Sequence, residues 1–159
     1  VDKLIVLANL APDIHIDIIG YNQLPQYLPL PNNITLHGYL TLEQYKKTLA
    51  MADVAISSLA LHRVKLEEAS PLKSRECLAF GLPLVIAYKD TDLVSQEHDF
   101  LLHIPNKEDN IQTHFSVIRD FVYRMRGYRV KRNQIVQLDQ KSKELKRISF
   151  FYEMLETKP

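Results

Sequence analysis

The chain has 159 residues, enough for one domain with a substantial core, and its formal net charge is +1. A nearly neutral charge gives no general attraction to nucleic acid, and the single cysteine, Cys77, excludes an internal disulfide framework. The apolar stretch 1–10 is too short to span a bilayer and lacks the features of a signal peptide. We therefore expect a cytoplasmic protein whose membrane contact, if present, is peripheral, at the inner face.

Short apolar runs alternate with longer helical stretches along the chain. An opening helix is expected at Asp2–Leu10. The strand-length runs end or begin at turn residues, and they are His15–Ile19, Ile34–His37, Val54–Ser57, Leu84–Tyr88 and Phe100–Ile104. Further helices are expected from a capping box at Thr41 to Ala52, from an N-cap at Ser70 to Gly81, over Asp109–Met125, and over Leu138–Leu155.

This alternation predicts an α/β fold with a Rossmann-like, doubly wound parallel sheet covered by helices on both faces. The expected helix Asp2–Leu10 comes before any strand, whereas the first strand of a doubly wound sheet is usually central. We therefore expect that residues 1–159 form a single domain truncated before its first strand, a fragment of a larger two-domain protein.

The segment Glu67–Val85 carries the most chemical information. An N-cap at Ser70 would leave free amides at a helix start, where unpaired N–H groups and the helix dipole favour an anion. Lys73 lies in that first turn, where the dipole disfavours a cation unless an anion is present. Glu76 lies roughly 8 to 9 Å further along the axis at about 1.5 Å per residue. This offset suits phosphates at the helix end and a ribose beside the second turn, because a carboxylate accepts hydrogen bonds from hydroxyl groups.

Two glutamates, Glu68 and Glu76, are separated by seven residues and followed by a small-residue helix and Gly81-Leu82-Pro83. Between them stands the sequence Ser-Pro-Leu-Lys-Ser-Arg, residues 70–75. This pattern resembles the nucleotide-sugar-binding C-terminal domain of retaining glycosyltransferases of the GT-B architecture (the group 1 family). The resemblance covers nearly the whole chain.

The resemblance implies transfer of a sugar from a nucleoside-diphosphate sugar to an acceptor hydroxyl, with retention, in the synthesis of cell-surface polysaccharide or another glycan. The acceptor, a glycan or a lipid-linked sugar, would bind through a missing N-terminal domain, so this chain alone would be inactive. Glu68 would contact the donor sugar as the catalytic residue, and Glu76 would hold the ribose. The diphosphate would be contacted by the segment Ser70, Pro71, Leu72 and Lys73. The family's loops after its second, third and fourth strands would correspond to Gly20, Tyr39 and Ser58, with the Tyr39 loop near the base. Beyond the donor, no cofactor is implied.

The sequence departs from that family at two points. The family supplies an arginine and a lysine for the diphosphate from a strand and loop that would precede Val1, and this chain does not contain them. The glycine-rich stretch that usually follows the first glutamate is replaced here by Ala69-Ser70-Pro71, which alters the contacts expected of Glu68.

Three other classes of protein were weighed. A sugar-nucleotide epimerase of similar fold should show additional acidic and histidine residues around the sugar, and none is identifiable. A receiver or other doubly wound binding module needs a phosphorylatable aspartate at a strand's carboxyl end, whereas Asp53 precedes its strand. A dinucleotide-binding dehydrogenase is also disfavoured, because the four scattered glycines form neither a dinucleotide fingerprint nor a P-loop. The histidines lack metal-ligand spacing, so no metal is expected, and the basic run 124–132 fits a solvated helix end and loop.

Overall fold

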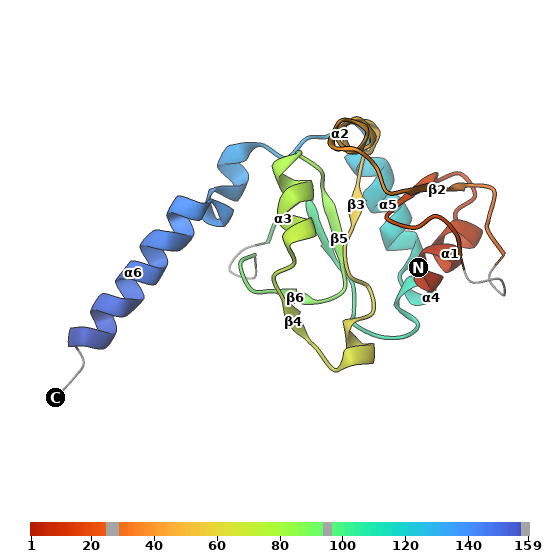
Figure 1. The fold of residues 1–159 in the computed structure, drawn as a ribbon. Helices are drawn as coiled ribbons and strands as arrows, with labels where there is room; N and C mark the ends of the chain where they lie inside the picture. The colour runs from red at the N-terminus through yellow and green to blue at the C-terminus, as the bar shows by residue number, and fades with distance from the viewer. Residues whose placement is uncertain (25–28, 94–96, 157–159) are drawn as a thin grey trace.

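The computed structural model describes residues 1–24, 29–93 and 97–156 (Figure 1). The α-helices are α1 (Asp2–Leu10), α2 (Leu42–Met51), α3 (Leu72–Ala79), α4 (Asn110–Thr113), α5 (Phe115–Met125) and α6 (Gln140–Glu156). The strands are β1 (Ile16–Ile19), β2 (Ile34–Gly38), β3 (Ala55–Ile56), β4 (Glu68–Ala69), β5 (Leu84–Ile86), β6 (Lys89–Asp90) and β7 (Leu101–His103). Two 3-10 helices, η1 (Leu61–Val64) and η2 (Arg132–Leu138), complete the order. The fold is therefore α/β, as predicted.

All the strand pairs of the described residues are parallel, but they form three small sheets rather than one. Their orders are β1-β2, β3-β5-β7 and β4-β6. Each of the five predicted strands is present with its ends shifted by at most two residues. The predicted parallel pairing is thus confirmed, but one continuous doubly wound sheet is not observed, because no ladder among the described residues joins β1 or β2 to β3.

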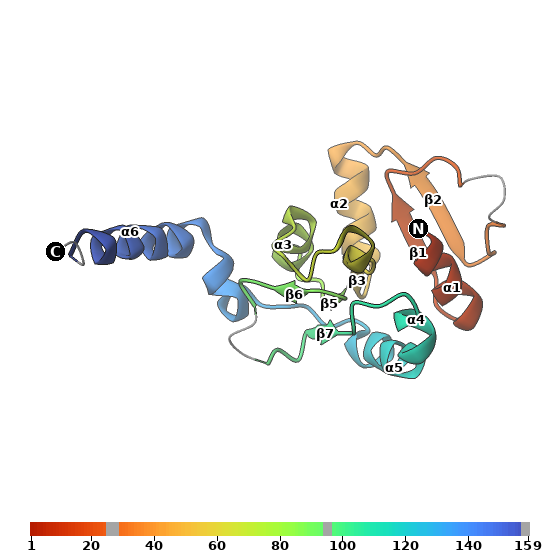
Figure 2. The ribbon, with the colours of Figure 1, turned by 90° about the horizontal axis from the view of Figure 1, so that it is seen from below.

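β5 is the centre of the molecule, because its side chains alternate between two separate apolar cores. Val85 and Ala87 point into a core built with α1, α4 and α5, whereas Leu84, Ile86 and Tyr88 point into a core that includes Leu78 of α3. Figure 2 shows α3 on one side of β5 and α5 on the other. A parallel strand buried on both faces is the arrangement that α/β layering requires.

Two predicted helices differ from those in the structure. The helix expected over Asp109–Met125 is divided into α4 and α5 at His114, whose backbone angles of φ −117° and ψ 16° are not helical. The Thr113 hydroxyl donates to the Asp109 carbonyl at 2.8 Å, a back-bond of the kind that bends helices. The last helix starts at Gln140 rather than Leu138, because Asp139 is extended and its carboxylate accepts from the Lys141 amide at 3.1 Å.

α6 extends away from the two cores (Figures 1 and 2). None of its described residues is buried, although its large apolar side chains fall at helical spacing as the sequence predicts. The exposed ones along this helix are Leu145, Ile148, Phe150, Phe151, Tyr152, Met154 and Leu155. The periodicity therefore predicted the helix correctly, although its apolar side chains do not pack into a core among the described residues.

Candidate functional site

The amino end of α3 is open to solvent. Its N-cap is Pro71, and no side chain caps it, so the predicted N-cap at Ser70 is wrong by one residue. The backbone at Pro71 is still extended, with ψ 135°, which delays the helix until Leu72. Leu72 is 85% exposed and Lys73 is exposed. The first amides of an α-helix have no acceptor within the helix, so those of Leu72 and Lys73 are available to a ligand.

Ser70 takes part in a polar network instead of capping the helix. Its hydroxyl donates to Asp92 Oδ2 and accepts from Arg75 Nη2, both at 2.9 Å. The Arg75 guanidinium makes a two-pronged ion pair with Asp90, at 2.7 and 2.6 Å, and also reaches Asp92 at 2.7 Å. Lys143 of α6 donates to Asp92 at 2.8 Å. This network fastens the segment before α3 to the segment after β6 and to the base of α6.

The contacts within this network stabilise its charged side chains. The Asp90 side chain is 1% exposed, so its charge depends on the Arg75 pair for stabilisation. Partial burial acts to raise the pKa of Asp92, but hydrogen bonds from Lys143, Ser70 and Arg75 outweigh it and lower that pKa to about 2. Burial likewise opposes the charge of Arg75, yet its aspartate partners raise the pKa of the guanidinium above its usual value. Asp92 and Arg75 therefore both keep their charges near neutral pH.

The two glutamates of the sequence motif lie before and after the open helix end along the chain. Glu68 on β4 is partly exposed and forms an ion pair with Lys89, its neighbour across the β4–β6 ladder. Glu76 lies in the second turn of α3, where its Oε2 accepts from the Tyr45 hydroxyl at 2.9 Å. Burial, followed by this bond to Glu76, raises the pKa of Tyr45, so Tyr45 remains a hydrogen-bond donor. Both carboxylates are therefore held in place and remain accessible.

Ser58 follows β3 and is tied to the sheet, because its carbonyl accepts from the Ala87 amide at 3.2 Å. The adjacent Ser57 forms a closed ring of hydroxyl groups with Ser74 of α3 and Tyr88, with oxygen separations of 2.7, 2.8 and 3.1 Å. All three residues are buried. The ring anchors the first turn of α3 to the carboxyl ends of β3 and β5.

Gly20 and Tyr39 lie just beyond the ends of β1 and β2. The Gly20 amide donates to the Gly38 carbonyl at 2.7 Å, so the ends of β1 and β2 stay together. Gly38 has a φ of +62°, and a side chain there would collide with Asn22, which explains the glycine. The β2–α2 connection lies at the end of the molecule opposite β4 and β6 (Figure 1). The structure therefore does not bring Tyr39, which is 87% exposed, next to Glu68.

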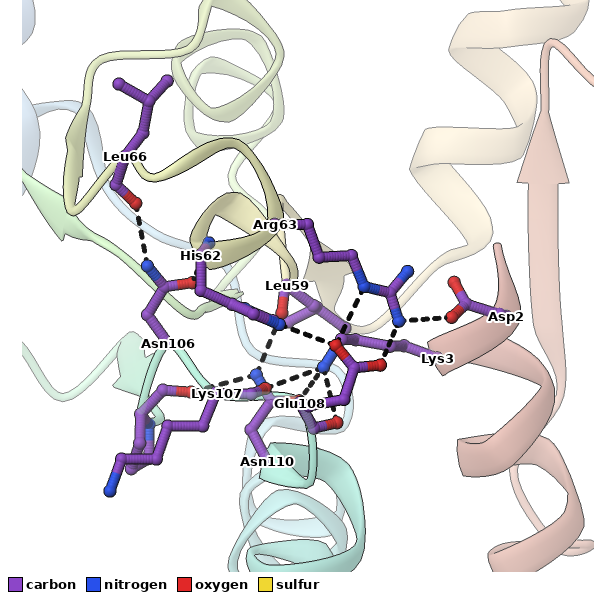
Figure 3. Close-up of polar contacts among 11 residues, drawn as sticks. Asp2, Lys3, Leu59, His62, Arg63, Leu66, Asn106, Lys107, Glu108 and Asn110 are labelled. Atoms are coloured by element: carbon purple, nitrogen blue, oxygen red, sulfur yellow. Dashed lines mark hydrogen bonds and ion pairs between the residues drawn. The ribbon is translucent and has the colours of Figure 1, made fainter.

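A second polar cluster, not recognised in the sequence, joins α1, η1 and the loop before α4 (Figure 3). The buried Lys3 ammonium donates to the carbonyls of Lys107 and Glu108, each at 2.8 Å, and to Asn110 Oδ1 at 2.9 Å. Arg63 pairs with Glu108 and with Asp2. Because all three hydrogens of Lys3 have acceptors, this cluster suits a structural role rather than ligand binding.

Glu108 is the centre of the exposed part of that cluster. Hydrogen bonds from Arg63 and then from His62 lower its pKa to about 2. Asn106 fixes the other side of His62, accepting from its backbone amide at 2.9 Å. In the sequence, the sign of this cluster is Lys3, which falls on the apolar side of the expected helix Asp2–Leu10. Sequence patterns alone do not distinguish such a lysine from a surface residue.

No group of three or more histidine, cysteine, aspartate or glutamate side chains in residues 1–24, 29–93 and 97–156 could hold a metal ion. None of the helices described there is both long and apolar enough to cross a lipid bilayer. Asp53 precedes β3 and accepts from the Gly127 amide at 2.8 Å, at the strand end opposite to that of a receiver's phosphorylation site.

Comparison with models of protein families, with curated proteins and with solved structures finds no match to this chain. The functional argument therefore depends on the residues and on their geometry.

Proposed function

We propose that this chain is the nucleotide-sugar-binding domain of a retaining glycosyltransferase of the GT-B type. The donor is a nucleoside-diphosphate sugar, and the acceptor, a glycan or lipid-linked sugar, binds through another domain of the enzyme. Synthesis of a cell-surface polysaccharide or related glycan fits this activity. One observation carries the proposal: two accessible carboxylates, Glu68 and Glu76, flank an uncapped helix amino end that is exposed to solvent.

The amino end of α3 supplies the binding site for the diphosphate. The free amides of Leu72 and Lys73 and the helix dipole favour a negatively charged ligand there. The positive charge of the exposed Lys73 ammonium strengthens this attraction. Rigid placement matters for such a site, because preorganised donors stabilise a leaving diphosphate without reorganising. The Arg75 network and the hydroxyl ring of Ser57, Ser74 and Tyr88 provide that rigidity.

Glu76 is suited to hold the ribose. Tyr45 occupies only Oε2, and Oε1 has no hydrogen-bond partner among the described residues, so it can accept from a sugar hydroxyl. Glu68 lies on β4, just before the helix end, where it would contact the transferred sugar. Lys89 beside it brings a positive charge to the same place. Catalysis then rests on positioning and on stabilising the leaving diphosphate.

Calorimetric titration of the protein with UDP, GDP and ADP tests this proposal. We expect one or more of them to bind, and Glu76→Gln to weaken that binding about tenfold, the effect of losing one charge-assisted hydrogen bond. Far-UV circular dichroism should show that the variant is folded.

Glu43→Gln is the matched control, because Glu43 is also exposed and, among the described residues, pairs only with Lys46 on α2. It should bind nucleotides as the wild type does. Absence of binding of all three nucleotides to the wild-type protein would contradict the proposal, as would equal losses in the Glu76 and Glu43 variants.

A further inference from the structure

A pocket of about 850 Å³ lies between α3 and η2 and includes the predicted ribose residue. Its walls include Glu76 and Ala79 on α3 and Arg132, Asn133 and Val136 on η2. Figure 1 shows the light-blue segment that precedes α6 beside α3. The volume falls in the range typical of small-molecule sites, and the walls mix apolar groups with a few polar ones.

Part of the polar wall of this pocket has no protein partner in the described part of the chain, whereas Asp139, which also lines the pocket, accepts from the Lys141 amide at 3.1 Å. No hydrogen bond or ion pair engages the side chains of Arg132, Asn133 or Gln140 there. Arg75, which also borders the pocket, is different because its guanidinium is already bound to Asp90 and Asp92. The Arg132 guanidinium and two carboxamides are therefore free to bind a ligand.

The position of the pocket along α3 identifies the part of the ligand that would fill it. The proposed diphosphate site is at Leu72 and Lys73, and the proposed ribose site is at Glu76. Along α3 the pocket is lined by Arg75 and Glu76 and continues to Ala79, which lies roughly 4 to 5 Å beyond Glu76 from the helix start at about 1.5 Å per residue. In a nucleoside diphosphate, the base is attached to the ribose on the side away from the phosphates. The order of sites along the helix therefore matches the order of groups in the ligand.

We infer that this pocket binds the nucleobase of the donor, and that Arg132 selects a base with carbonyl acceptors, uracil or guanine, over adenine. The inference rests on the proposed function. A guanidinium only donates hydrogen bonds, so it matches the carbonyl oxygens of uracil or guanine, whereas adenine presents an amino donor at the corresponding edge. The apolar groups of Ala79, Ile135 and Val136 cover a base face, and the carboxamides of Asn133 and Gln140 can pair with either kind of edge group.

The test is calorimetric titration of the wild type and of Arg132→Gln with UDP, GDP and ADP. We expect the wild type to bind UDP or GDP at least tenfold more tightly than ADP. Arg132→Gln should weaken binding of the preferred nucleotide about tenfold and leave the ADP affinity unchanged. A merely structural role for Arg132 would not alter this ratio of affinities.

Arg126→Gln is the matched control, since Arg126 is an exposed arginine outside the pocket whose recorded contact is with the Tyr123 ring. It should keep the wild-type ratio. Equal weakening of all three nucleotides by Arg132→Gln, or ADP binding as tight as UDP and GDP in the wild type, would overturn the inference. If Glu76→Gln weakens binding and Arg132→Gln does not, the proposed function stands and the base site is elsewhere. If no nucleotide binds the wild type, both proposals fail.

Discussion

Asp92 connects more parts of the candidate site than any other residue described here. Its carboxylate accepts from Ser70 before α3, from Arg75 within α3 and from Lys143 on α6. Three donors around one partly buried carboxylate stabilise its ionised form, which is why its pKa lies near 2. A depressed pKa is also a statement about stability, because the folded state then binds the proton less well than the unfolded state.

We predict that Asp92→Asn lowers the free energy of unfolding at pH 7 by about 1 kcal/mol, a value discounted for partial exposure. A carboxylate with a lowered pKa stabilises the folded state at pH values above its pKa in the unfolded chain, near 3.8. This stabilisation is lost as the pH falls to about 2, the pKa in the folded state. The difference between variant and wild type should therefore shrink between pH 4 and pH 2. Urea unfolding followed by circular dichroism at several pH values measures it.

Asp120→Asn provides the comparison, because Asp120 is exposed on α5 and has no recorded ion pair or hydrogen bond among the described side chains. Its free energy of unfolding should match that of the wild type at every pH. A difference between Asp92→Asn and the wild type that stays constant down to pH 2 would argue against the ionic explanation.

Among the helices, α2 has the most complete amino-terminal cap, and the sequence predicted it. The Gln44 amide donates to the Thr41 hydroxyl at 3.3 Å, and the Thr41 amide donates to Gln44 Oε1 at 3.0 Å. We predict that Thr41→Ala lowers the free energy of unfolding by about 1 kcal/mol. Thermal or urea unfolding would measure this loss. Thr41→Ser, which keeps the hydroxyl, should restore most of the stability, and failure of serine to do so would show that the cap is not the cause.

Element positions could be predicted well because turn residues mark them. Gly20, Gly38 and Gly81 all adopt positive φ values, and each closes a strand or helix where the sequence indicates an end. The start of α3 was less predictable, because Ser70 and Pro71 both suit a helix start and only the extended backbone at Pro71 decides between them. A one-residue error there changes the role of Ser70 from helix cap to a partner of Asp92.

Features formed by residues distant in sequence could not be predicted. The Lys3 contacts join residues more than 100 positions apart, and the Glu68–Lys89 pair depends on the register of β4 and β6. The sequence did place Glu68, Ser70, Lys73 and Glu76 around one helix end, since they are close along the chain. It did not reveal that β1 and β2 form a separate sheet.

At the scale of the whole molecule, the two cores around β5 provide most of the burial and α6 provides little. We predict that ending the chain after Asp139 changes the free energy of unfolding by less than about 1 kcal/mol, since none of the described residues of α6 is buried and its Lys143–Asp92 pair is partly exposed. Phe121→Ala, in contrast, empties a site that is 2% exposed and should cost about 3 to 5 kcal/mol. Differential scanning calorimetry compares them. A large loss on truncation would show that α6 packs on the body in solution.

The hydroxyl ring of Ser57, Ser74 and Tyr88 differs from the Arg75 network in how it responds to acid. It contains no ionised group, and burial raises the pKa of Tyr88 further from neutrality, so protons in solution leave it unchanged. Protonation of Asp92 near pH 2 weakens the bonds that it accepts from Ser70, Arg75 and Lys143. Strong acid should therefore loosen the segment that precedes α3, at Ser70, while Ser74 keeps the first turn of α3 bound to the sheet. This loosening would begin beside the proposed phosphate site.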